Sequence, residues 1–88
     1  MSYLGLDPAA VRQLAQQMNN AASEIQTLSG QLTAQLQGAP WTGPDRENFV
    51  NEWQSTHLNQ LHVVIQALQN AANTANRNAQ EQEQVSAS

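Results

Sequence analysis

Apolar residues recur along the first half of the chain in a strict alternation of three and four residues, which severely limits the folds available to it. The series runs through Val11, Leu14, Met18, Ala21, Ile25, Leu28 and Leu32. Such spacing places one apolar stripe along one side of an α-helix. The intervening residues are mostly Gln, Asn, Ser and Thr. We therefore predict an amphipathic helix over about residues 8–37.

The ends of this first helix carry recognisable signals. Asp7 can accept a hydrogen bond from an amide of the first turn, and Pro8 suits the first helical position. Gly38 is the expected C-terminal cap. Gly30 within the helix either costs up to about 1 kcal/mol relative to Ala or allows a neighbouring backbone to approach closely.

A second helix is predicted over about residues 45–80. Its apolar side is formed by Phe49, Val50, Trp53, His57, Leu61, Val64, Ile65, Leu68, Ala72, Ala75 and Ala79, mostly three or four residues apart. Thr42 with Asp45 fits a capping box, and Asp45 as the cap itself is the competing register. The remaining polar, unpatterned residues 81–88 are expected to form a flexible tail.

Helix breakers gather between the two predicted helices, in a turn at residues 38–44. Pro40 disfavours a helical conformation at Ala39, and Gly43 supplies either a positive φ angle or room for close backbone approach. Each helix is about 45 Å or longer. So short a connection folds the helices back on each other. The predicted fold is all-α: a single domain, residues 1–88, forming an antiparallel two-helix hairpin.

The two apolar stripes together exceed what one hairpin can cover. The predicted hairpin and dimer seam comprises Val11, Leu14, Met18, Ile25, Leu28, Leu32, Phe49, Trp53, Leu61, Val64, Ile65 and Leu68. Because burial is worth about 25 cal/mol per Å², several half-exposed large side chains forgo several kcal/mol, comparable to the whole stability of a small domain. We expect a four-helix bundle, formed by a second copy or by a similar hairpin.

Composition and charge exclude several functions. The formal charge is −4 with only three basic residues, so nucleic acid and anionic membrane surfaces are poor ligands. No apolar run reaches the ~18 residues of a membrane span. The first residues show neither a basic leader nor a long apolar run. We expect synthesis in the cytoplasm without a conventional secretory signal peptide.

No constellation of residues indicates catalysis. His57 and His62 are five residues apart, which places them on different helix faces, and there is no cysteine. Neither a nucleophile with its base nor a phosphate-binding loop is recognisable. We expect a protein that is not an enzyme and that binds no cofactor or metal.

The turn carries a tripeptide, Trp41, Thr42 and Gly43, that resembles the W-x-G motif of the WXG family, the early-secreted-antigen-like proteins. Chain length, helical arms and the central position of the motif all match. The resemblance implies a dimer of helical hairpins, homomeric or heteromeric, that is exported in folded form by a type VII (ESX-type) secretion system. It also implies that Trp41 and Gly43 form part of a composite export signal with the end of the partner's helices. Two roles for Trp41 remain open: it forms part of a recognition surface, or its ring closes the end of the helical bundle.

One element of the family's pattern is missing. The family's Y-x-x-x-D/E motif follows the second helix, whereas the only tyrosine here is Tyr3, with Asp7 four residues on. A partner that carries the motif would supply it, or a homodimer is recognised differently. An alternative function is a cytoplasmic helical adaptor or chaperone, which pairs with the helical N-terminal region of a larger toxin-like effector.

Overall fold

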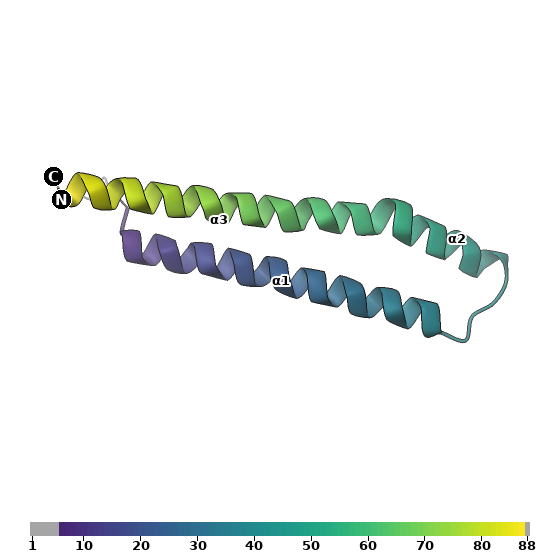
Figure 1. The fold of residues 1–88 in the computed structure, drawn as a ribbon. Helices are drawn as coiled ribbons and strands as arrows, with labels where there is room; N and C mark the ends of the chain where they lie inside the picture. The colour runs from purple at the N-terminus through teal and green to yellow at the C-terminus, as the bar shows by residue number, and fades with distance from the viewer. Residues whose placement is uncertain (1–5, 88) are drawn as a thin grey trace.

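The computed structural model describes residues 6–87, and within them the chain is helical except at residues 6 and 7 and at its corner. Helix α1 spans Pro8–Gly38, α2 spans Pro44–Glu52, a π-helical turn η1 spans Trp53–His57, and α3 spans Leu58–Ala87. The prediction of an all-α fold is confirmed. The molecule is a rod of 66 × 17 × 16 Å, in which α1 and α3 lie side by side and run in opposite directions (Figure 1). We call this arrangement the antiparallel pair.

Helix α1 begins as the sequence predicts and ends one residue later than expected. Asp7 Oδ1 accepts a hydrogen bond from the Ala9 amide at 3.1 Å, and Pro8 occupies the first turn. Ala39 has an extended conformation (φ −69°, ψ 141°), as expected for a residue before proline. Ala39 rather than Gly38 is therefore the C-terminal cap, and its amide donates to the Leu36 carbonyl.

The predicted capping of the second helix is wrong. Gly43, not Thr42 or Asp45, is the N-terminal cap, and no side chain accepts a hydrogen bond there. Gly43 has φ 112° and ψ 178°, a region almost closed to other residues. Pro44 then starts the helix with its fixed φ angle. The helix thus begins by glycine–proline geometry, which removes the need for a capping side chain.

The second helical arm is interrupted by one π turn, which explains an irregular interval in the sequence. Half-buried positions fall at Arg46, Val50, Trp53, Leu58 and Leu61, at intervals of four, three, five and three residues. The five-residue step is absorbed by η1, where the Leu58 amide donates to the Trp53 carbonyl. A continuous α-helix would instead turn His57 inward. His57, which the sequence placed on the apolar side, is consequently exposed.

Polar side chains support this π turn. The Ser55 hydroxyl donates to the Asn51 carbonyl at 2.6 Å, and Asn59 Nδ2 donates to the Ser55 carbonyl at 2.8 Å. A π turn disturbs the regular pairing of amides and carbonyls, so side-chain donors at these positions satisfy acceptors that the backbone serves less well.

The expected flexible tail over residues 81–88 is helical as far as Ala87, so this prediction is wrong for residues 81–87. Two contacts account for the extension. Gln82 is half-buried, and Glu83 forms a two-pronged ion pair with Arg12 at the start of α1. The last turns of α3 therefore have a packing partner that periodicity alone did not reveal.

The centre of the antiparallel pair is lined by small residues. The fully or nearly fully buried positions are Ala15, Ala22 and Ser29 on α1 and Ile65, Ala72 and Ala79 on α3. On each helix they recur every seven residues, which keeps them on one line along the contact. We call these six residues the buried line. Among the described residues, no large side chain is completely enclosed.

Candidate interaction site

The corner between α1 and α2 presents Trp41 to the solvent. The Trp41 amide donates to the Ala39 carbonyl at 2.8 Å, which tightens the bend just before the tryptophan. Gly43 then reverses the chain with its positive φ angle. A Cβ atom at Gly43 would meet nothing within 4 Å, so the glycine is required for its conformation and not for close approach. The Trp41 side chain remains 37% exposed.

Trp41 rests against the aromatic ring of α2. Its ring centroid lies 5.3 Å from that of Phe49, with the planes tilted by 55°, a favourable aromatic geometry. Beneath this pair, Leu32, Leu36, Phe49 and Trp53 line a small apolar depression. The corner is therefore an aromatic and aliphatic cluster that is open to solvent on one side.

A hydrogen-bond relay fixes the position of Trp53 within this cluster. Its indole Nε1 donates to Thr33 Oγ1 at 2.8 Å, and the Thr33 hydroxyl donates to the Ser29 carbonyl at 2.8 Å. Because the relay joins η1 to α1, it sets the register of the two arms next to the corner. The Trp53 ring also lies near His57, with ring centroids 6.1 Å apart and the planes tilted by 49°.

The twelve residues of the predicted seam are distributed over three environments. Ile65 is buried. Val11, Met18, Ile25, Trp53, Leu61 and Leu68 are half-buried. Leu14, Leu28, Leu32, Phe49 and Val64 are exposed. Thus the antiparallel pair brings together only part of the set and leaves five of its large side chains facing water.

The buried line contains three residues that the sequence analysis did not place on an apolar side, Ala15, Ala22 and Ser29. Ala72 and Ala79 were predicted on the apolar side of the second helix, and both are buried. Their common signal was present, because each lies seven residues from another small or apolar residue. Small side chains at the centre of a contact allow two helices to approach closely, and this is the physical reason for their burial. Gly30, by contrast, has open space where a Cβ would sit, so the close-approach interpretation of that residue is wrong.

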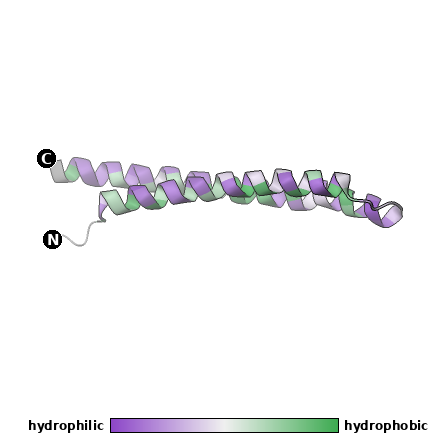
Figure 2. Ribbon diagram, turned by 90° about the horizontal axis from the view of Figure 1, so that it is seen from below, coloured by the Kyte–Doolittle hydropathy of each residue, from purple (hydrophilic) through white to green (hydrophobic). Residues whose placement is uncertain are grey.

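Four exposed large apolar residues share one position relative to the contact between the helices. Leu14, Leu28, Phe49 and Val64 each stand immediately before a buried or half-buried residue, as Leu28 precedes Ser29 and Val64 precedes Ile65. The half-buried Ala21 and the exposed Ala71 hold the same position before Ala22 and Ala72. We call these six residues the apolar face. Figure 2 shows the resulting alternation of apolar and polar residues along both long helices.

The opposite side of the antiparallel pair is polar. The row four residues after each buried position is Asn19, Gln26, Thr33, Gln69, Asn76 and Glu83. Residues from both helices, including Gln26, His62 and Gln69, line one shallow groove there. Since this shared groove and the Arg12–Glu83 ion pair mark one side, the two rows of the apolar face lie together on the other. We call the polar side the amide face.

The ion pair on the amide face shifts the pKa values of both partners. Arg12 Nη2 lies 2.7 Å from Glu83 Oε1, and Arg12 Nε donates to Glu83 Oε2 at 3.2 Å. The hydrogen bond from Arg12 lowers the pKa of Glu83, and the same bond raises the pKa of Arg12. Both side chains are nearly half exposed, so the pair contributes orientation more than stability.

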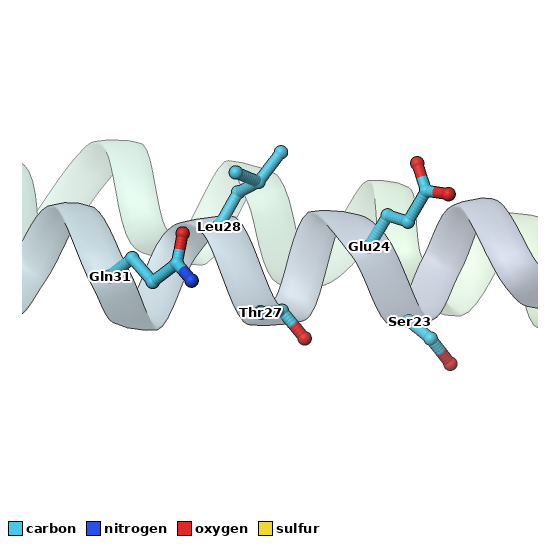
Figure 3. A pocket seen from close by; sticks show the side chains of 5 residues that line it. All are labelled: Ser23, Glu24, Thr27, Leu28 and Gln31. Atoms are coloured by element: carbon cyan, nitrogen blue, oxygen red, sulfur yellow. The ribbon is translucent and has the colours of Figure 1, made fainter.

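A shallow depression on α1 alone shows how charge borders the apolar face. It is lined by Ser23, Glu24, Thr27, Leu28 and Gln31. Figure 3 shows Glu24 and Leu28 projecting to the same side of the helix, while Ser23 and Thr27 point away from them. One helix lines the whole depression, so it does not enclose a ligand. It does place a carboxylate directly beside an exposed leucine.

The described residues offer neither a metal site nor a membrane span. Between residues 6 and 87, no three His, Cys, Asp or Glu side chains gather where they could share a metal ion. Over the same residues, none of the helices is both long and apolar enough to cross a bilayer. Tyr3, the tyrosine of the sequence's only Y-x-x-x-D arrangement, lies outside the described residues, whereas Asp7 is the helix cap.

No protein-family model, curated protein or solved structure matches this chain.

Proposed function

We propose that this protein is a WXG-type, non-catalytic substrate or component of a type VII (ESX-type) secretion system, which acts as a homo- or heterodimeric helical hairpin. One observation carries the proposal: the W-x-G tripeptide lies in the corner that joins the two antiparallel arms (Figure 1), and Trp41 is partly exposed there. In this position an otherwise common tripeptide coincides with the architecture that the family resemblance implies.

The apolar face supports the dimeric part of the proposal. Leu14, Leu28 and Val64 remain 47%, 55% and 45% exposed, although they occupy helix positions next to the buried line. The face follows one side of a rod 66 Å long, so a partner helix can lie along it rather than touch it at one end. A second helical hairpin laid along this face completes a four-helix bundle.

Trp41 is proposed to be part of a recognition surface. Its ring is held against Phe49 at a defined angle, yet more than a third of the side chain faces solvent. Partly exposed, well-positioned tryptophan is typical of residues that dominate binding energy at protein interfaces. The conformation of Gly43 fixes where the tryptophan is presented.

Export from a bacterium with a working type VII system tests the proposal. Trp41→Ala is expected to lower the secreted amount by about tenfold, the loss that ~1.4 kcal/mol of recognition energy produces. Helix content measured by circular dichroism is expected to stay near that of the wild type, because Trp41 lies in the turn between α1 and α2 and belongs to neither helix. Thr42→Ala, within the same motif and exposed, is the matched control and should be exported normally.

Two results would contradict the proposal. Equal export of wild type and Trp41→Ala removes the recognition role. Retention of the wild-type chain in the cytoplasm, bound to the N-terminal region of a larger effector, favours the adaptor function instead.

A further inference from the structure

The charged residues along the outer edge of the apolar face are all acidic. Glu24 and Glu81 each lie two residues after a buried alanine of the contact, on the outer edge of the face. Asp45 and Glu52 lie four residues before and three residues after Phe49, which makes them its neighbours on the surface of α2. We call Glu24, Asp45, Glu52 and Glu81 the acidic rim. It holds four of the seven acidic residues of the chain.

The three arginines lie elsewhere. Arg12 is engaged with Glu83 on the amide face. Arg77, five residues after Ala72, falls on the side of α3 that points away from α1, although it stands four residues before Glu81 and so lies beside that rim residue. Arg46 stands three residues before Phe49, but it is half-buried and lies seven residues before the half-buried Trp53, in the row that faces α1. Hence no arginine of the described chain occupies the outer edge of the apolar face itself.

From this arrangement we infer that the apolar face binds a helical hairpin whose own apolar face is bordered by lysine or arginine, in preference to a second copy of this chain. The inference rests on the dimeric hairpin proposed above and specifies its partner. When two apolar faces meet, the residues at their edges approach each other, as the flanking charges of coiled coils do. A second copy would oppose carboxylates to carboxylates, whereas a basic border would form ion pairs. Like-charge contacts of this kind select against wrong partners.

The many uncharged Gln and Asn residues increase the influence of the acidic rim on the choice of partner. Gln and Asn supply about a quarter of the residues, and charged residues only 11%, so few other charges compete with the rim in choosing a partner. Glu24 stands beside Leu28 in Figure 3, where the carboxylate would meet the edge of any helix laid on the leucine. Selectivity therefore depends on a few identifiable positions.

A charge-reversed copy of the chain serves as the probe, because it presents the same apolar face with a basic border. The variant carries Glu24→Lys, Glu52→Lys and Glu81→Lys. Sedimentation equilibrium at low ionic strength is expected to show the mixture of wild type and variant associating about tenfold or more tightly than either chain with itself. The preference should shrink in 1 M salt, where the Debye length falls to about 3 Å.

Two further variants separate the rim from overall charge. Neutralising the rim with Glu24→Gln, Glu52→Gln and Glu81→Gln raises the charge by three and should strengthen self-association. Adding three lysines on the amide face, Asn19→Lys, Gln26→Lys and Gln69→Lys, raises it equally and should not. Circular dichroism verifies that each variant is folded.

The outcomes are distinguishable. If the wild type pairs with itself as tightly as with the charge-reversed copy, the basic-partner inference is overturned while the dimeric proposal stands. If the three glutamine substitutions on the rim and the three lysine substitutions on the amide face strengthen self-association equally, the rim has no special role and the inference also fails. If no combination associates at any concentration, the inference and the dimeric proposal fall together.

Discussion

Two substitutions that each remove aliphatic side-chain atoms should distinguish the contribution of the buried line to stability from that of the apolar face. Ile65→Ala acts on the buried line, where Ile65 is 6% exposed. Leu28→Ala acts on the apolar face, where Leu28 is 55% exposed. In dilute solution the first should destabilise the folded chain strongly and the second only mildly.

The magnitudes follow from the burial of each side chain. Truncating a buried aliphatic residue to alanine typically costs about 2–5 kcal/mol, and Ile65 belongs to this class. Full burial of a leucine is worth about 1.5–3 kcal/mol, and Leu28 has less than half of its surface covered, so its loss should cost about 1 kcal/mol. Alanine also has a higher helix propensity than leucine, which reduces that cost slightly.

Urea denaturation followed by circular dichroism at low micromolar concentration measures both free energies of unfolding. The same pair is then compared in the complex with the charge-reversed copy. There Leu28→Ala should cost more than it does in the chain alone, because the partner now covers the side chain. Equal destabilisation of the dilute chain by both substitutions would refute the division between buried line and apolar face.

Three smaller predictions concern single residues or residue pairs. Thr33→Val removes the acceptor of the indole hydrogen bond and should cost about 1 kcal/mol, with a shift in tryptophan fluorescence; an unchanged melting temperature and spectrum would contradict the relay. Gly43→Ala forces alanine into a conformation that favours glycine and should lower the free energy of unfolding by about 1–3 kcal/mol. Gly30→Ala, at an open helical position, should raise it by up to about 1 kcal/mol. Thermal melts of the two variants compare these effects. The lowered pKa of Glu83 means that its stabilising effect is present above the ordinary glutamate range and is lost as pH falls through the folded-state pKa. Arg12→Gln should therefore lower the melting temperature slightly at pH 7 and not at low pH, and an equal effect at both would rule out the ion pair as the cause.

The start of α1, the bend at its end and the all-helical class could be predicted from sequence because each depends on local chemistry. Asp7 and Pro8 act within one turn, and Pro40 acts on the residue before it. Regular three-and-four spacing likewise produces an amphipathic helix wherever it occurs. No contact between distant residues is needed for any of these inferences.

Which side of each helix turns inward could not be predicted in the same way. On α1 three neighbouring rows are apolar or small, represented by Val11, Leu14 and Ala15, and spacing alone does not say which two face α3. The structure buries the alanine row because small side chains permit close helix contact, and it leaves the leucine row outside. The prediction from sequence ranked side chains by the apolar area they could bury. It therefore favoured the large leucines over the small alanines for the contact.

The π turn and the helical tail also depend on long-range packing. Trp53 and Leu58 share one side of the arm only because η1 inserts an extra residue, and the relay through Thr33 holds that register. The apolar series predicted from sequence instead ran through His57 at intervals of four, so it contained no five-residue step from Trp53 to Leu58. At the other end, Glu83 finds Arg12 across 71 residues of sequence, a pairing that no local pattern encodes.

The most direct test of whether the apolar face is a binding surface along the rod combines small-angle X-ray scattering with light scattering. Both are measured on the complex that the wild-type chain forms with itself or with its charge-reversed copy. The account predicts twice the mass of the 9.6 kDa chain at a maximum length still close to 66 Å, since the partner lies alongside. A complex of doubled length, joined end to end, or a particle that keeps the mass of one chain in every mixture would contradict it.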